Sequence, residues 1–450
     1  MIEGRANKSL GPVLACAILA AAATGAAAEA QAGLSLEECV RRAQTSSESA
    51  AIGVAKTAAA AARLDYARRQ YFPSLALSGS FTHSSEIEPG ELTIDLGAMG
   101  SKTITMPESL QDAWLFRLGL QQPLFSGFRI EGGIRQAEAG LDAARAEERM
   151  AGRAAGAAAE KAWWALYMAR ESAAVVEESA AAQRAHVEEA RARLESGAGL
   201  KSELLSARMR EADIDAMAAE ARAARDLARA RLNILIGLPW DAPTELAGPA
   251  EPKFDGAAPD ARELALKAKA ARPELGAAAA RVAAQEAALA AARSPLLPNV
   301  FLTGSYSLAD PNPKAFPQRS GFESYWDVGV LVSMDLGRAP AALAQVDEAR
   351  RALEQARLAL GQAKDSVELD VVSACLELTK CAERLRASAS SVDLAEEALR
   401  SAKDRLAAGL AVASTVSDAE NDLLRSKLER TRSRVAWELA RIALRDAIGE

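Results

Sequence analysis

The spacing of hydrophobic residues changes along the chain, and each change marks a predicted element. Over residues 34–70 apolar side chains recur every three to four positions, which predicts a helix. Ser35 and Glu38 form a capping box at its start. After Pro73 the period becomes two, so successive side chains point to opposite faces, as they do in a β-strand.

Four segments of about 10 residues alternate in this way, and a tilted strand of that length crosses the core of a bilayer. The same alternation also fits half-buried strands of a soluble β-sandwich. Two features favour the membrane: the strands come in two short pairs with no other strand-forming sequence, and a tryptophan occupies the equivalent end of each second strand. The residues predicted to face lipid are Leu75, Leu77, Phe81, Trp114, Phe116, Leu118, Leu120, Val300, Leu302, Tyr306, Trp326, Val328 and Val330.

A long helical pattern follows each strand pair after a short corner that contains glycine. The two patterns cover residues 128–196 and 339–407, and at 1.5 Å per residue each helix would be about 100 Å long. Each ends at a tight glycine turn, here called a tip turn, and a shorter helix returns over residues 200–236 or 410–448. The tip turns contain Gly197 and Gly199 in the first case and Gly409 and Leu410 in the second.

The whole arrangement occurs twice. Gly197 and Gly237 are matched by Gly409 and Gly449, each 212 residues later. The sequence therefore predicts two repeats joined by a proline-rich linker. The first repeat covers residues 34–237, the linker 238–259 and the second repeat 260–449.

The helix lengths suggest how the short helices are arranged. Helices 200–236 and 260–293 together equal one long helix in length, and so do helices 410–448 and 34–70. Each of these two pairs is therefore predicted to stand end to end beside a long helix.

The composition agrees with helices that pack closely through small side chains. Half of the residues are hydrophobic, but much of that fraction is alanine and only 4% of the chain is aromatic. The net charge of -7 disfavours nucleic acid as a partner. Residues 1–30 read as a signal peptide, with Arg5 and Lys8 before an apolar run. Val13–Cys16 resembles a lipoprotein cleavage box, so lipidation of Cys16 remains an alternative to simple cleavage.

Few residues suggest chemistry. Cys39, Cys375 and Cys381 are an odd number spread over helices, which predicts small core residues rather than a disulfide framework. His83 and His186 are predicted to be ordinary polar residues, so no metal or other cofactor is expected. No catalytic motif is found, so the chain is not expected to be an enzyme.

Taken together, these features resemble the TolC-like outer-membrane efflux protein family over essentially the whole mature chain. The likeness rests on the repeated strand starts Phe72–Leu75 and Leu297–Val300, the corner Pro123–Gly127, the tip turns, and the helix ends at Gly237 and Gly449. The family implies a mainly α fold with a membrane β-barrel, in which a homotrimer closes one 12-stranded barrel in the outer membrane on a coiled-coil tunnel in the periplasm. Four strands cannot close a barrel, so several copies of the chain must share one if the strands lie in a membrane.

The resemblance also implies a function and partners. Members are passive exit ducts of tripartite efflux or type I secretion systems, and they dock on a periplasmic adaptor protein and an inner-membrane transporter. The main alternative is a periplasmic adaptor or a structural coiled-coil stalk, which would lack the repeat. The sequence does not indicate the exported substrate.

The family's gate lies at the tip turns, which also resemble adaptor-docking surfaces. Glu203, six residues after Gly197, and Asp418, nine after Gly409, fall where acidic residues ring the pore, and three copies of each would favour cations at the entrance. Taken alone, both are also ordinary solvated charges near the starts of helices. The family's Tyr–Arg latch is not expected, because Thr415, Leu406 and Ala411 occupy the places of its residues and of the second aspartate.

Overall fold

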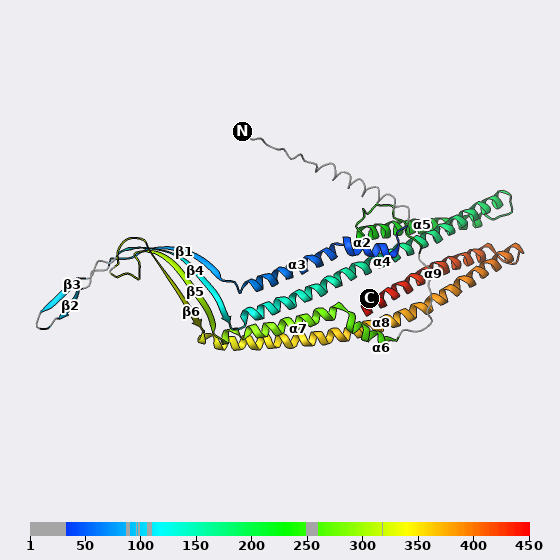
Figure 1. Ribbon diagram of the computed structural model, residues 1–450. Helices are drawn as coiled ribbons and strands as arrows, with labels where there is room; N and C mark the ends of the chain where they lie inside the picture. Colours follow the sequence, from blue (N-terminus) through cyan, green and yellow to red (C-terminus); the bar gives the residue numbers. More distant parts are fainter. Residues whose placement is uncertain are drawn as a thin grey trace, which may run out of the picture. The chain divides into compact units, whose positions relative to one another are not determined.

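The computed structural model is mainly helical, and its elements follow one another as labelled in Figure 1. It describes residues 33–86, 91–95, 97, 100–105, 110–248, 260–316 and 318–450. The predicted signal peptide with Cys16 and residues 249–259 of the predicted linker lie outside this part. None of the helices in it is both long enough and apolar enough to cross a membrane.

The chain divides into two units, which are described separately. The sheet unit comprises Thr57–Ala144 and Ala277–Gly361. The hairpin unit comprises Met1–Lys56, Arg145–Gly276 and Gln362–Glu450.

Four strands form one antiparallel sheet in the sheet unit. Their order is β1-β4-β5-β6, so the two predicted strand pairs join through β4 and β5. The side-chain alternation read from the sequence continues without a phase shift through β1, β5 and β6. The strands are β1 (Ser74–His83), β4 (Asp112–Ser126), β5 (Asn299–Asp310) and β6 (Glu323–Ser333).

A second, two-stranded sheet lies between β1 and β4, where no further strand was expected. β2 (Glu91–Asp95) and β3 (Ser101–Thr105) pair in antiparallel register, with the Thr93 and Thr103 hydroxyls 3.2 Å apart. The expectation of only two strand pairs was therefore wrong. Strands of five residues are too short to produce a clear alternation of apolar and polar positions.

The chain passes from β4 into a helix at the predicted glycine corner. The β4–β5 register shifts between Pro123 and Phe125. Gly127 has φ 59°, and a Cβ there would lie 2.8 Å from the carbonyl oxygen of Ser294. Glycine is required at this position for both reasons. The Ser126 hydroxyl then accepts a hydrogen bond of 3.2 Å from the amide of Ile130, in the first turn of the helix.

Both long helices form within two residues of their predicted ends. α4 (Arg129–Glu195) has 67 residues and α8 (Ala339–Ala407) has 69. The return helices are α5 (Lys201–Leu235) and α9 (Ala413–Ile448). Each long helix and its return helix form an antiparallel hairpin, with its turn at Gly197 or Gly409 (Figure 1).

The two helices that precede β1 and β5 are each broken, where single helices were expected. The breaks are at Ser47 and Arg272, whose backbones are extended. Pro273 explains the second break, because a proline disfavours helical geometry in the residue before it. Ser47 has no following proline; its hydroxyl accepts a hydrogen bond of 3.3 Å from the amide of Ser49, as the N-cap of the next helix does. The resulting helices are α2 (Leu36–Ser46), α3 (Glu48–Arg69), α6 (Ala261–Ala271) and α7 (Pro273–Ala292).

Each break lies against the end of a return helix. A Cβ at Gly237, after α5, would lie 3.1 Å from the Cβ of Ser46, and a Cβ at Gly449, after α9, would lie 2.9 Å from the Cβ of Ala271. Thus α5 meets α2, and α9 meets α6. The prediction that helix 200–236 stands end to end with 260–293, and helix 410–448 with 34–70, was therefore wrong. Exchanging the partners leaves the summed lengths the same, so helix length could not distinguish the two arrangements.

The core of the hairpin unit is built around α9. One cluster joins Trp163 of α4 and Leu232 of α5 to Ile442 of α9. On another side, Cys375 of α8 packs in a cluster with Ala447 of α9. α9 belongs to the second hairpin and packs against both helices of the first. Movement of one hairpin against the other must therefore disturb the contacts of α9.

Candidate functional site

The four-stranded sheet has one apolar face. One cross-strand row on it consists of Leu77, Leu118, Tyr306 and Trp326. All residues predicted to face lipid lie on this face, and in the chain by itself Leu77 is 79% exposed and Trp326 71% exposed. An exposed apolar surface of this extent marks a site of contact with lipid or with another protein.

Both outer strands of the sheet have an unpaired edge within the described part of the chain. β1 pairs only with β4, and β6 pairs only with β5. These strands have 10 and 11 residues, so each edge presents a row of backbone amides and carbonyls that no described strand pairs with. Long apolar edges of this kind pair with further strands.

The two tip turns are closed by the same backbone hydrogen bonds. Gly197 has φ 77° and Gly409 has φ 71°, a conformation that glycine adopts without steric cost. The residue after each glycine donates its amide to a carbonyl five positions back: Ala198 at 2.9 Å and Leu410 at 2.8 Å. This pattern is the Schellman motif, which ends helices.

Other tip residues have different roles. A Cβ at Gly199 would lie 3.0 Å from the Cβ of Arg193, so close packing requires glycine there. Leu410 is 72% exposed, although it is apolar. An exposed leucine on a turn is available to a partner.

Glu203 and Asp418 lie on different helices, and no contact joins them. Glu203 is in the first turn of α5, where its carboxylate accepts a hydrogen bond of 3.4 Å from the amide of Leu200. Asp418 is an exposed residue of α9, and no other side chain of the described chain pairs with it. Glu203 therefore has a capping role, while Asp418 has no structural partner that explains it.

The hairpins are held together at one turn of α9, which we call the clasp, Ser417–Glu420. The Glu420 carboxylate lies 3.0 Å from Nε2 of His186 on α4 and 3.5 Å from Nζ of Lys403 on α8. Arg210 of α5 donates a hydrogen bond of 2.6 Å to the Ser417 hydroxyl. All three neighbouring helices thus contact this turn of α9. The clasp was not predicted, and His186 was expected to be an ordinary polar residue. Its contact with Glu420 and that of Arg210 with Ser417 join residues more than 200 positions apart, which leave no local pattern.

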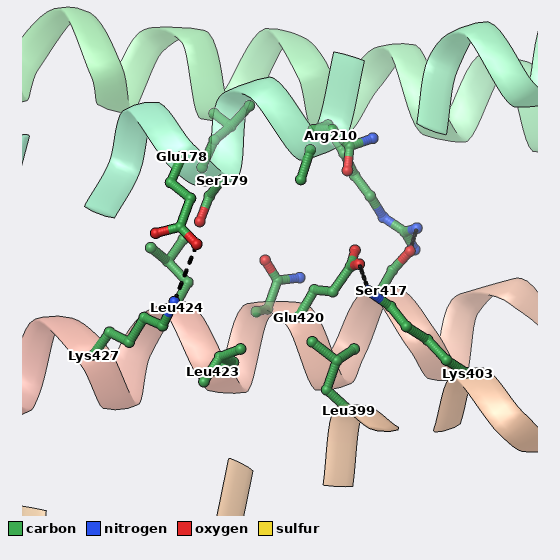
Figure 2. A pocket seen from close by; sticks show the side chains of 14 residues that line it. Glu178, Ser179, Arg210, Leu399, Lys403, Ser417, Glu420, Leu423, Leu424 and Lys427 are labelled. Atoms are coloured by element: carbon green, nitrogen blue, oxygen red, sulfur yellow. Dashed lines mark hydrogen bonds and ion pairs between the residues drawn. The ribbon is translucent and has the colours of Figure 1, made fainter. Parts of the chain in front are cut away.

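Two cavities lie beside the clasp, and Arg210 and Ser417 line both. One, of about 200 Å³, is drawn in Figure 2, where Glu178 pairs with Lys427 and Glu420 with Lys403. The other, of about 330 Å³, is also lined by His186 and Glu203. At this level polar bridges and open space separate parts of the two hairpins, and an apolar cluster that includes Ile214 of α5 and Leu424 of α9 joins them next to the smaller cavity.

Buried titratable groups lie away from the clasp. Burial raises the pKa of the Cys39 thiol to about 11, and it also raises the pKa of Cys375 and Cys381. All three thiols are free and buried, which confirms the prediction of small core residues. Burial likewise raises the pKa of Glu438 on α9, and this outweighs the opposite effect of the Arg441 guanidinium 2.9 Å away. No cluster of residues that could hold a metal ion is present in the described part of the chain.

Known proteins resemble this chain in sequence and in fold. A family model described as outer membrane efflux protein matches residues 40–238 and 264–450. The outer membrane efflux protein BepC of Brucella suis biovar 1 (strain 1330) is 26% identical over 330 residues, which are 73% of this chain and 71% of that protein.

Two solved structures illustrate the likeness in fold. The outer membrane protein VceC from Vibrio cholerae superposes with a TM-score of 0.75 at 19% identity, over 92% of this chain and 96% of that one. The CmeC outer membrane channel of Campylobacter jejuni has a TM-score of 0.75 at 15% identity, over 92% of this chain and 85% of that one. At such identities the likeness concerns the fold alone.

Proposed function

The chain belongs to the outer membrane efflux protein family, and we propose that it is a passive exit duct in the outer membrane. The family resemblance found in the sequence is thereby confirmed. The family and its structural neighbours are transport channels and not enzymes. The observation that carries the proposal is the four-stranded sheet, which has one exposed apolar face and two unpaired edges.

Those edges support a homotrimer. A strand edge inside a bilayer must be paired, because no water is present there to satisfy its backbone groups. If the β1 edge of one copy pairs with the β6 edge of the next, three copies of four strands give a closed barrel of 12 strands. The apolar face then meets lipid, and the polar face lines the lumen.

The repeat organisation is also part of the proposal. Residues 34–237 and 260–449 form two repeats joined by the linker 238–259, and the helix ends support this view. Gly237 and Gly449 have φ 76° and 93°, and the residue after each donates its amide to a carbonyl five positions back, as at the tip turns. Equivalent glycines thus have equivalent roles in both halves.

The helical hairpins would extend into the periplasm and control entry at the tip turns. Asp418 supports this role, since it is exposed and no side chain among the described residues pairs with it. Three copies of Asp418 and Glu203 would place carboxylates around the entrance and favour cations there. The exposed Leu410 supports docking of a periplasmic adaptor, through which an inner-membrane transporter would deliver the substrate.

The test is conductance. Purified full-length protein, added in detergent to a planar lipid bilayer, is expected to produce stepwise currents. The double variant Glu203→Gln with Asp418→Asn is expected to keep the currents but to lose preference for cations. A preparation that is folded and inserted in the bilayer but passes no current would contradict the duct.

A further inference from the structure

The polar face of the four-stranded sheet carries two charges in its middle. Its three inner rows are Ser74–Gln121–Thr303–Gly329, Ala76–Gly119–Ser305–Asp327 and Ser78–Arg117–Ser307–Tyr325. Arg117 and Asp327 are the only charged residues in these rows. Most of the others are small. The largest, Tyr325, has the ammonium of Lys314 4.7 Å from its ring centre, which adds a cation beside these rows.

Both charged side chains form hydrogen bonds to serines of the strand between them, β5. Arg117 of β4 donates a hydrogen bond of 3.3 Å from Nε to the hydroxyl of Ser307, and this serine is fully buried. The hydroxyl of Ser305 donates a hydrogen bond of 2.7 Å to the carboxylate of Asp327 on β6. Arg117 and Asp327 therefore reach toward β5 from opposite sides, on neighbouring rows.

The two charges do not neutralise each other. The backbones of their strands, β4 and β6, are about 10 Å apart, and no salt bridge joins the two side chains among the described residues. Their hydrogen bonds are to neutral hydroxyls, which leave the full charge of each group in place. Because both side chains are exposed, water or permeating ions can approach them.

We propose that Arg117 and Asp327 set the charge selectivity of the duct at the level of the membrane, separately from the carboxylates of the tip turns. This inference rests on the proposed function, because the polar face becomes a lumen only when the barrel closes. Three copies would then place three guanidinium groups and three carboxylates around one level of the lumen. The arginines attract anions and the aspartates attract cations, so the wild-type balance depends on both.

The range of these charges is sufficient at low salt. At 0.01 M ionic strength the screening length is about 30 Å, so these charges can act on ions that pass through the lumen without touching the wall. At 0.1 M it falls to about 10 Å, so the effect is expected to weaken. Removing three like charges should change the ratio of cation to anion permeability by about twofold at low salt.

The experiment measures the reversal potential of the full-length protein in planar bilayers under a potassium chloride gradient near 0.01 M. Arg117→Gln is expected to shift selectivity toward cations and Asp327→Asn toward anions. Arg117→Lys, which keeps the charge, is expected to match the wild type. The shifts should shrink when both salt concentrations are raised tenfold.

A second measurement tests the orientation without relying on current. In proteoliposomes, Arg117→Cys is expected to react with a charged, membrane-impermeant thiol reagent, while Leu118→Cys on the opposite face does not. Currents with unchanged reversal potentials in both neutral variants would overturn the charged lumen and leave the duct standing. Equal labelling of the two cysteines would also overturn it. A wild-type protein without any current would overturn the duct and this inference together.

Discussion

The sheet unit and the hairpin unit differ in how far their backbone hydrogen bonds are completed within one chain. In the sheet unit, apolar side chains such as Leu77 and Trp326 are exposed, and neither outer edge of the sheet is paired by another strand that the structure describes. In the hairpin unit, the helix ends are closed by their own backbone bonds, and α9 is held by three neighbouring helices. Under the proposed function, the sheet depends on lipid and on further copies of the chain. The hairpins complete their helix ends within one chain, although Leu369 and Leu394 of α8 are also exposed.

The largest expected effect tests whether the apolar face of the sheet meets lipid. Leu77→Arg should destabilise the inserted protein by about 2–4 kcal/mol, the cost of a cation at the middle of a bilayer. In water the same change would cost little, because Leu77 is 79% exposed in the chain by itself. Urea unfolding of the protein in lipid vesicles measures the difference.

The matched control is Ala76→Arg, on the opposite face of the same strand and across from Gly119. It is expected to have a much smaller effect, because that face would meet water. Equal stability of the Leu77→Arg variant and the wild type would remove the reason to place this face against lipid.

Close helix packing within the sheet unit gives the next effect. A Cβ at Gly132 of α4 would lie 2.9 Å from the Cβ of Ala291 of α7, so Gly132→Ala should cost about 1–3 kcal/mol through overpacking. Gly133, the next residue, has no atom within 4 Å of such a Cβ. Gly133→Ala should instead stabilise the helix by about 0.5–1 kcal/mol. Thermal unfolding measures both, and the same sign for the two variants would show that α4 and α7 are not this close.

The clasp is the corresponding test in the hairpin unit. Glu420→Gln removes the charge that faces His186 and Lys403, and loss of a charge-assisted hydrogen bond on a mostly buried side chain should cost about 1–2 kcal/mol. Amide hydrogen exchange should therefore speed up in the first turns of α9. Glu397→Gln is the control, because Glu397 is exposed and pairs only with Arg400 of its own helix. Unchanged exchange in the Glu420 variant would mean that the clasp does not hold the hairpins.

The smallest expected effect is a pH dependence at Glu438. Burial raises the pKa of this carboxyl in the folded chain above its ordinary value of 4.5. Between these two pKa values the folded chain holds a proton that the unfolded chain has lost, so the free energy of unfolding falls as pH rises through that interval. Glu438→Gln should remove this part of the pH dependence. Parallel stability curves for variant and wild type from pH 4 to pH 8 would contradict the assignment.

Sequence predicted elements more accurately than contacts between them. The alternation at Leu75–Phe81 placed one apolar face, and glycines such as Gly197 and Gly409 marked the helix ends, because both signals are local in the chain. The break at Ser47 and the partner of α5 escaped prediction, since neither changes the hydrophobic period.

The candidate sites divide in the same way. Glu203 was named through its place after Gly197 in the family resemblance, and its role at a pore stays a prediction. Its capping contact with the amide of Leu200 is local. The contact of His186 with Glu420 joins residues 234 positions apart, so it can be identified only in the folded chain.

The central claim is that one chain leaves its sheet open and that three copies close it. The most direct measurement is the native mass of the full-length protein extracted from membranes in mild detergent. The account predicts a complex of three copies that resists dissociation until the barrel unfolds. A folded, stable monomer that stays in solution without detergent would contradict it.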